Sequence, residues 1–207
     1  MPRRGPRPVL AALVLLLAGG PSSAWAGPPT DQLRGSIDRV IRVLEDPELR
    51  RESRTAERRA VIRRIANEIF DFTEITRRCL GRHWQARTPD EREEFTRLFT
   101  DLLERAYIGK LESYSGERVV YLGDAADDDV ASVRTRLVTR QGTEIPVEYR
   151  MHRRDGRWLV YDVAIEGVSL VANYRAQFNK TIQTASYSGL VERLRAKQDE
   201  ARTALPK

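Results

Sequence analysis

The spacing of apolar residues divides the chain into a helical first half and a strand-rich second half. From Thr30 to about Tyr114, apolar side chains recur every three or four residues, as they do on one face of an α-helix. One predicted helix ends at Asp46-Pro47, and its apolar face consists of Leu33, Ile37, Val40, Ile41 and Leu44. A second runs to about Phe70, and its apolar face consists of Val61, Ile62, Ile65, Ala66 and Ile69.

A third helix has a clear start in the sequence. Thr88 can cap it, Pro89 suits its first turn, and Glu91 completes a capping box. The spacing therefore predicts a long amphipathic helix, whose apolar face consists of Phe95, Leu98, Phe99, Leu102, Leu103, Ala106 and Leu111.

From Glu117 the apolar period changes to two residues, which is typical of strands. The predicted strands are Arg118–Leu122, Val130–Thr139, Glu144–Arg153 and Arg157–Ile165. The short links between them are rich in turn residues and favour hairpins, so we expect an antiparallel meander. One face of the third strand is polar, and the other carries Ile145, Val147, Tyr149 and Met151.

The run WLVYDVAIEGVSLVANYRAQF, Trp158–Phe178, stays apolar from the last strand into a helix. Ser169 can cap that helix, which we expect to reach Gln183, and a last charged helix is expected near Ser188–Ala201. Gly167, before the cap, is expected to need either a positive φ angle or a close approach of the backbone. The pattern predicts one α+β domain over residues 27–207. Helices over 30–114 and 169–201 would wrap a curved, antiparallel, four-stranded sheet over 117–165 and leave an apolar cavity.

Residues 1–26 have the pattern of a cleaved signal peptide. Three arginines precede an apolar run at residues 9–18, and Ala24 and Ala26 supply a small-x-small cleavage site. The run is shorter than the roughly 20 residues that a bilayer requires, so we expect export rather than anchoring. Without these arginines the net charge falls from +6 to +3, which argues against nucleic-acid binding.

Few residues in the sequence suit catalysis. Cys79 is the only cysteine, and its neighbours favour a small core residue over a reactive thiol. His83 has no neighbours at metal-ligand spacing, and His152 lies on the polar face of its strand, where a surface position is expected. No metal site is predicted, and no motif for nucleophilic or phosphate-binding chemistry occurs.

Two carboxylates have alternative interpretations. Asp162 is placed by strand alternation on the face of Val160, among apolar residues. It suits either a proton-shuttling base or an ion pair with Arg134 or Arg136, and the ion pair is favoured. Asp71, between two phenylalanines, is expected to end or begin a helix.

A basic run extends from Arg50 to Arg64. Such runs are usually solvated helix faces. The alternative is a surface that docks onto anionic head groups or an acidic partner, and its candidate docking residues are Arg58, Arg59 and Arg63.

Two long segments resemble the MlaC family, also called the toluene-tolerance auxiliary proteins. They are FDFTEITRRCLGRHWQARTPDEREEFTRLFTDLLERAYIGKLESY and IPVEYRMHRRDGRWLVYDVAIEGVSLVANYRAQF. The most specific parts are Phe70-Asp71-Phe72, Leu80-Gly81-x-x-Trp84, Tyr161-Asp162-Val163 and Glu166-Gly167-Val168-Ser169-Leu170, and the resemblance covers about residues 30–200. It implies an NTF2-like sheet and a phospholipid carrier in the periplasm of a Gram-negative bacterium.

The resemblance also implies partners. These are an outer-membrane lipoprotein complex and an inner-membrane ABC transporter with an MCE-domain subunit, between which lipid is shuttled to keep phospholipid out of the outer leaflet. We expect a monomer that is not an enzyme and has no cofactor, since its phospholipid is cargo. Strand alternation and helix faces predict a cavity lined by Ile65, Ile69, Phe99, Leu103, Val147, Tyr149, Met151, Val163, Ile165, Val168, Leu170 and Tyr174.

Two other classes of protein stay open from the sequence. One is an enzyme of the same fold that acts on an apolar substrate with Asp162 as base, although histidines are scarce and no second acid or nucleophile is evident. The other is a structural adaptor whose apolar residues are all core.

Overall fold

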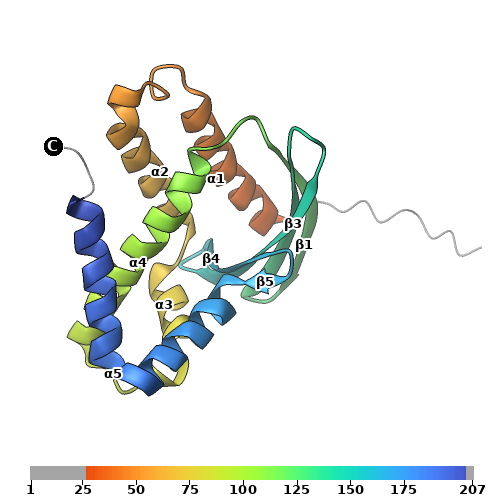
Figure 1. The fold of residues 1–207 in the computed structure, drawn as a ribbon. Helices are drawn as coiled ribbons and strands as arrows, with labels where there is room; N and C mark the ends of the chain where they lie inside the picture. The colour runs from red at the N-terminus through yellow and green to blue at the C-terminus, as the bar shows by residue number, and fades with distance from the viewer. Residues whose placement is uncertain (1–26, 204–207) are drawn as a thin grey trace, which may run out of the picture.

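Helices and strands occupy separate parts of the molecule (Figure 1). The structure is a computed structural model that describes residues 27–203, so the predicted signal peptide at 1–26 lies outside the described residues. The helices are α1 Pro28–Glu45, α2 Thr55–Ile69, α3 Phe72–Leu80, α4 Pro89–Leu111 and α5 Leu170–Thr203. The strands are β1 Arg118–Asp127, β2 Val130–Val138, β3 Glu144–Arg154, β4 Arg157–Ile165 and β5 Val168–Ser169.

The strands form an antiparallel sheet in the order β1-β2-β3-β4-β5. This confirms the meander and the α+β class, and adds the short strand β5 to the four that the sequence predicts. Glu166 (φ 50°) and Gly167 (φ 80°) form the turn from β4 to β5, so the positive φ angle is the one of the two alternatives for Gly167 that is confirmed. A Cβ at Gly167 would meet no atom within 4 Å, so a side chain there would strain the backbone without a clash.

Side-chain caps fix where two helices begin. The capping box predicted for α4 is confirmed, because the Thr88 hydroxyl accepts from the Glu91 N–H (3.2 Å) and the Glu91 carboxylate accepts from the Thr88 N–H (2.8 Å). The Asp71 carboxylate accepts from the Glu74 N–H (2.9 Å) at the start of α3, which confirms its helix-end role. Helix α3 itself is missing from the sequence prediction, because nine residues hold too few repeats of the helical period.

Helix α5 joins the two predicted C-terminal helices through a kink at Ser186 (φ 70°, ψ 171°). The cap predicted at Ser169 is confirmed, since its hydroxyl accepts from the Ala172 N–H (3.0 Å). Within residues 27–203, no helix has an apolar stretch long enough to cross a membrane.

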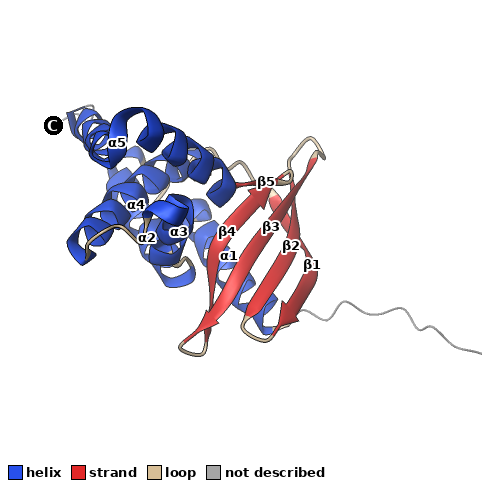
Figure 2. Ribbon diagram, turned by 90° about the horizontal axis from the view of Figure 1, so that it is seen from below, coloured by secondary structure: helices blue, strands red, loops and turns tan. Residues whose placement is uncertain are grey.

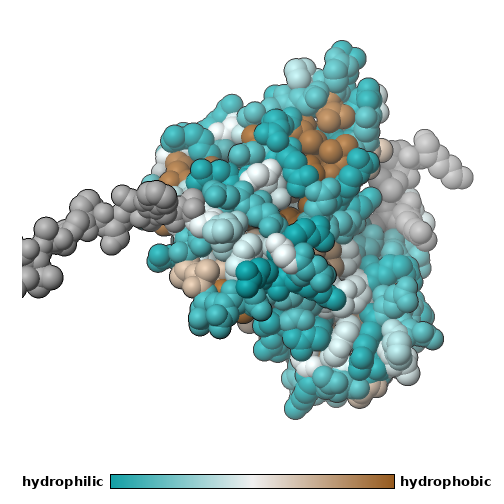
Figure 3. All heavy atoms as spheres, turned by 180° about the vertical axis from the view of Figure 1, so that it is seen from behind, coloured by the Kyte–Doolittle hydropathy of each residue, from teal (hydrophilic) through white to brown (hydrophobic). Residues whose placement is uncertain are grey.

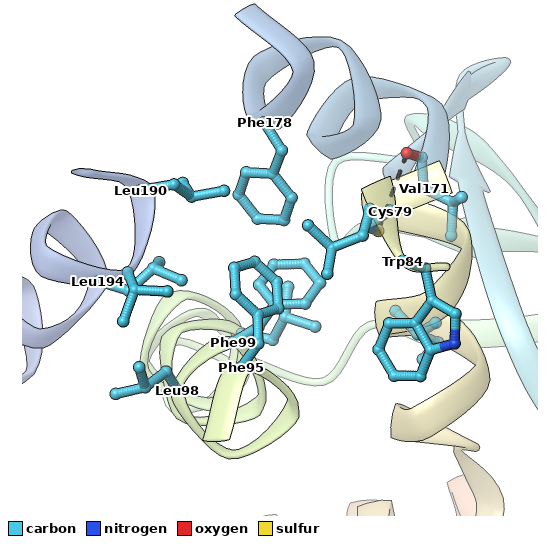
Figure 4. Packing of buried hydrophobic residues seen from close by; sticks show 13 residues of the cluster. Cys79, Trp84, Phe95, Leu98, Phe99, Val171, Phe178, Leu190 and Leu194 are labelled. Carbon is cyan, nitrogen blue, oxygen red and sulfur yellow. Dashed lines mark hydrogen bonds between the residues drawn. The ribbon is translucent and has the colours of Figure 1, made fainter. Parts of the chain in front are cut away.

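Buried apolar residues form three clusters. The largest joins α3, α4 and α5 around Phe95, Phe99 and Phe178 (Figure 4). The second joins α1 and the end of α2 to the sheet and contains Leu33, Ile69, Ala131, Val133, Met151, Trp158 and Val160. The third consists of Leu44, Ile62 and Ile108, between α1, α2 and α4. The largest cluster contains no strand residue, whereas the second contains residues of β2, β3 and β4. An apolar boundary therefore separates the core of α3, α4 and α5 from the core under the sheet.

Cys79 lies in the largest cluster and is fully buried. Its thiol is 3.9 Å from the Val171 carbonyl oxygen (Figure 4). Burial raises the pKa of the thiol to about 12, so it stays protonated, as expected of the small core residue that the sequence predicts.

Candidate functional site

Four apolar side chains form a strip on one face of β3 and β4. Val147 pairs with Ile165 and Tyr149 pairs with Val163, so these four residues, the apolar strip, share a face. Val147, Tyr149 and Val163 are half-buried, and Ile165 is 43% exposed. The same face continues into the fully buried second cluster. The cover over the sheet therefore ends partway along these strands.

A β-bulge in β4 decides which residues join the apolar strip. Met151 pairs with Val160, but Arg150 pairs with Asp162, so Tyr161 is an extra residue. Because Arg150 and Met151 point to opposite faces of β3, Asp162 and Val160 also lie on opposite faces. The prediction that they share a face is wrong, since the alternation is interrupted at Tyr161.

Asp162 anchors the start of α5. Its side chain is buried, and its oxygens accept hydrogen bonds from the first turn of α5 (3.0 Å), the Ser169 hydroxyl (2.6 Å) and Arg150 (3.3 Å). The ion pair predicted with Arg134 or Arg136 forms instead with Arg150, because Arg150 on β3 lies directly opposite Asp162, whereas Arg134 and Arg136 lie on β2, one strand further away. Asp162 therefore points away from the apolar strip and offers no base there.

The remaining residues of the predicted lining differ in how far they are buried. Leu170 and Tyr174 are half-buried at the edge of the largest cluster, and Val168, at the β4–β5 turn, is 65% exposed. The fully buried members are Ile65, Ile69, Phe99, Leu103 and Met151. In this conformation the buried members are core, and their place in a lipid cavity stays a prediction.

Tyr121 extends the face of the apolar strip and was missed from the sequence. It pairs with Thr135, which pairs with Val147, so all three share a face. The Tyr121 hydroxyl is buried without a hydrogen-bond partner among residues 27–203, and this burial raises its pKa. Arg34 of α1 lies 4.5 Å above the ring. Strand alternation in β1 was the signal that would have found it.

Both histidines have partners of their own. His152 is half-buried, with Nε2 3.2 Å from the Asp71 carboxylate, which also accepts from Arg154 (3.2 Å). The prediction of a plain surface position for His152 is wrong, because the residues that lead into α3 run beside β4, and from there the Asp71 carboxylate reaches His152. His83 Nε2 lies 3.0 Å from the Asn179 side-chain oxygen. The described part of the chain holds no group of residues suited to a metal ion.

The three arginines proposed for docking are bound to carboxylates of the protein itself. Arg58 (3.0 Å) and Arg59 (2.7 Å) pair with Glu112, and Arg63 pairs with Glu104 (2.6 Å). The hydrogen bond from Arg59 is the largest of the contacts that lower the pKa of Glu112. These residues therefore tie α2 to α4, and reversing their charge would also weaken that tie.

Two clefts of the described residues lie away from the apolar strip. One, about 390 Å³ in volume, runs between α1 and α2 and includes only Ile65 from the predicted lining. The other, about 420 Å³, lies beside Trp84 and α4.

Comparison with known proteins gives one family. The family model described as MlaC protein matches residues 34–196. The intermembrane phospholipid transport system binding protein MlaC of Haemophilus influenzae is 24% identical over 115 residues, 52% of this chain and 54% of that protein. The toluene tolerance protein ttg2D of Pseudomonas putida is 25% identical over 183 residues, 87% of this chain and 82% of that protein. The matched part of the chain thus spans about half of the first relative and most of the second.

A solved structure extends the likeness to three dimensions. It is a phospholipid-binding protein of Ralstonia solanacearum in complex with a phospholipid, 26% identical to this chain with a TM-score of 0.74. The likeness covers 84% of this chain and 98% of that one. Since the family model spans most of the described residues and the fold agrees, this chain belongs to the MlaC family.

Proposed function

We propose that this protein carries phospholipid through the periplasm of a Gram-negative bacterium and holds the acyl chains against the apolar strip. The observation that carries the proposal is the strip itself, an apolar face of β3 and β4 that the helices leave partly uncovered. Membership of the MlaC family and the phospholipid bound to the Ralstonia relative support it.

The size of the cargo explains why a carrier is needed. A diacyl lipid exposes about 30 methylenes to water, each worth roughly 0.8 kcal/mol, or about 25 kcal/mol in all. Leu170 and Tyr174 on α5 lie half-buried at the edge of the largest cluster, and they would form a second wall only after the helices move relative to the strip. The protein then replaces bilayer contacts with side-chain contacts along both acyl chains.

Loading requires the helices to move relative to the sheet. Phe70 is half-buried and packs against both the largest cluster and the sheet cluster, so it marks the boundary between them. Widening this boundary would expose apolar side chains on both sides without breaking strand pairing. Packed helices can slide, whereas a sheet resists because its hydrogen bonds would break.

The carrier needs no catalytic group. Asp162 is held by three hydrogen bonds at the start of α5, so the proposal contains neither an enzymatic step nor a cofactor. The protein would act as a monomer that exchanges lipid between an outer-membrane lipoprotein complex and an inner-membrane ABC transporter with an MCE-domain subunit.

Two aspartate variants test the proposal. Ile165, on the strip, is 43% exposed, and Val120, on the opposite face of β1, is 41% exposed. Because a carboxylate at position 165 would meet the acyl chains, Ile165→Asp should lose most of its bound lipid, whereas Val120→Asp should keep it. The measurement is organic extraction of protein purified from the periplasm of a Gram-negative host, followed by mass spectrometry.

Wild-type protein should release phospholipid in about stoichiometric amount. Circular dichroism of both variants checks that each is folded, as their similar exposure leads us to expect. Equal lipid content in the two variants would remove the strip from the proposal, and wild-type protein without lipid would contradict the carrier function.

A further inference from the structure

A groove between α1 and α2 has no assigned role. Its volume is about 390 Å³, near the lower end of ligand pockets. Its apolar floor consists of Val43, Leu49, Val61 and Ile65, and its rim of Arg39, Arg42, Asp46, Arg64 and Glu68. In the back view, hydrophobic atoms gather over this part of the molecule, near the top (Figure 3). We call it the α1–α2 groove.

The neighbouring side of the same two helices shows what fits there. Helix α4 packs against it, with Ile108 buried between Leu44 of α1 and Ile62 of α2. Carboxylates at the edges of α4 then pair with arginines of α2, as the contacts of Glu104 and Glu112 show. An amphipathic helix with acidic flanks is thus the natural complement of α2 within this protein.

The α1–α2 groove repeats these features without the third helix. Arg39 is paired with Glu68 (2.6 Å), and Asp46 accepts hydrogen bonds from the loop that follows it (2.8 and 3.1 Å). Arg42 and Arg64 face each other across the floor from the two helices, are exposed, and form no ion pair within residues 27–203. On the filled side, Glu112 and Glu104 likewise meet guanidinium groups beside apolar residues, those of Arg58, Arg59 and Arg63.

We propose that the α1–α2 groove binds an amphipathic helix of a partner protein, with its apolar residues on the floor and acidic residues against Arg42 and Arg64. The concave shape favours a helix over a membrane surface, because the apolar residues lie at the bottom of the groove and cannot reach into a flat bilayer. The groove is separate from the apolar strip, so docking here is independent of the proposed lipid site.

A designed peptide tests this proposal directly. The probe is a fluorescein-labelled helical peptide of about five turns with leucines on one face and glutamates at its edges, so that it repeats the pattern of α4. Fluorescence anisotropy at low ionic strength should show that the double variant Arg42→Glu/Arg64→Glu binds it at least about tenfold more weakly than wild type. The charge-matched control Arg118→Glu/Arg134→Glu, altered at exposed arginines of the sheet, should bind like wild type.

Charge exchange sharpens the result. A second peptide with lysine in place of each glutamate should bind the Arg42→Glu/Arg64→Glu variant better than it binds wild type, which a merely unfolded variant would not do. Equal binding of the acidic peptide by the two double variants would overturn the proposal. Two other outcomes, both measured by sedimentation, would also overturn it. One is binding to phosphatidylglycerol vesicles that depends on Arg42 and Arg64 when peptide binding does not, and the other is self-association with the same dependence.

Discussion

Strand β4 is core at its beginning and partly open at its end, although its sequence is apolar throughout. Trp158 and Val160 are 8% and 0% exposed and pack beneath α1 and the end of α2. Val163 is half-buried and Ile165 is 43% exposed. Figure 2 shows why: α1 crosses one face of the sheet, while the other helices gather beside β4.

The difference shows that burial by neighbouring helices, rather than the hydrophobicity of the residue itself, decides whether an apolar residue of this strand belongs to the core or keeps surface that a ligand could contact. Val160 and Val163 are the same residue type on the same face. One completes the core, and its burial contributes to folding in every molecule. The other has apolar surface left over, which a ligand can cover.

The largest expected effect comes from placing a carboxylate at each of these two valines. Val160→Asp should fail to fold, because an unpaired charge in a fully buried site costs several kcal/mol, comparable with the roughly 5–15 kcal/mol that stabilises a domain. Val163→Asp should lose only about 1 kcal/mol, since water reaches this half-buried position, but should lose bound phospholipid. Thermal unfolding and lipid mass spectrometry measure the two outcomes.

Val160→Ala is the control for packing alone, and it should fold with a moderate loss of stability. If Val163→Asp also fails to fold, both ends of β4 are core and the contrast between them is wrong. If Val163→Asp folds but keeps its lipid, the open end of β4 does not contact the acyl chains.

Local signals in the sequence were enough for much of this fold. The capping box at Thr88 and the turn at Gly167 depend on neighbouring residues only, and both are confirmed. The face of β3 that contains Tyr149 and Met151 was predicted because this strand has regular alternation. Helix α3 was not predicted because it is short, and β5 was not predicted because it has only two residues.

The site was harder to predict, because it depends on tertiary contacts. The bulge at Tyr161 places Asp162 on the face opposite Val160, and no local residue pattern predicts this bulge. Similarly, the sequence does not show that Glu112 and Glu104 neutralise the basic face of α2. Alternation identified apolar residues on the correct face of β3, yet which of them stay partly uncovered follows only from where α1 crosses the sheet.

A smaller loss of stability is expected at the bulge. Asp162→Ala would leave the start of α5, the Ser169 hydroxyl and Arg150 without their shared acceptor. We expect the free energy of unfolding to fall by about 2–4 kcal/mol, measured by urea denaturation. Asp162→Asn keeps one acceptor oxygen and should recover part of this loss while retaining bound lipid. Loss of lipid from a stable Asn variant would mean that Asp162 acts on the cargo rather than on the fold.

The smallest expected effect concerns the ionisation of Tyr149, which lies opposite Val163 on the strip. Burial raises the pKa of its phenol to about 12, and a hydrogen bond with Thr135 opposes this rise. A raised pKa means that the neutral phenol is favoured in the folded state. Its contribution to stability is therefore complete below pH of about 10, where an unfolded tyrosine titrates, and is lost as pH rises through the folded value.

Tyr149→Phe should accordingly unfold less readily than wild type between pH of about 10 and 12, and ultraviolet titration should show one phenolate fewer in the late-ionising group. Lipid loading should delay the ionisation of Tyr149 in wild type further, because acyl chains on the strip exclude water from the hydroxyl. An ordinary titration near pH of about 10, with or without lipid, would mean that water already reaches the Tyr149 hydroxyl. The partly open end of β4 would then be a wetted surface, and the contrast with Val160 would no longer identify a place for acyl chains.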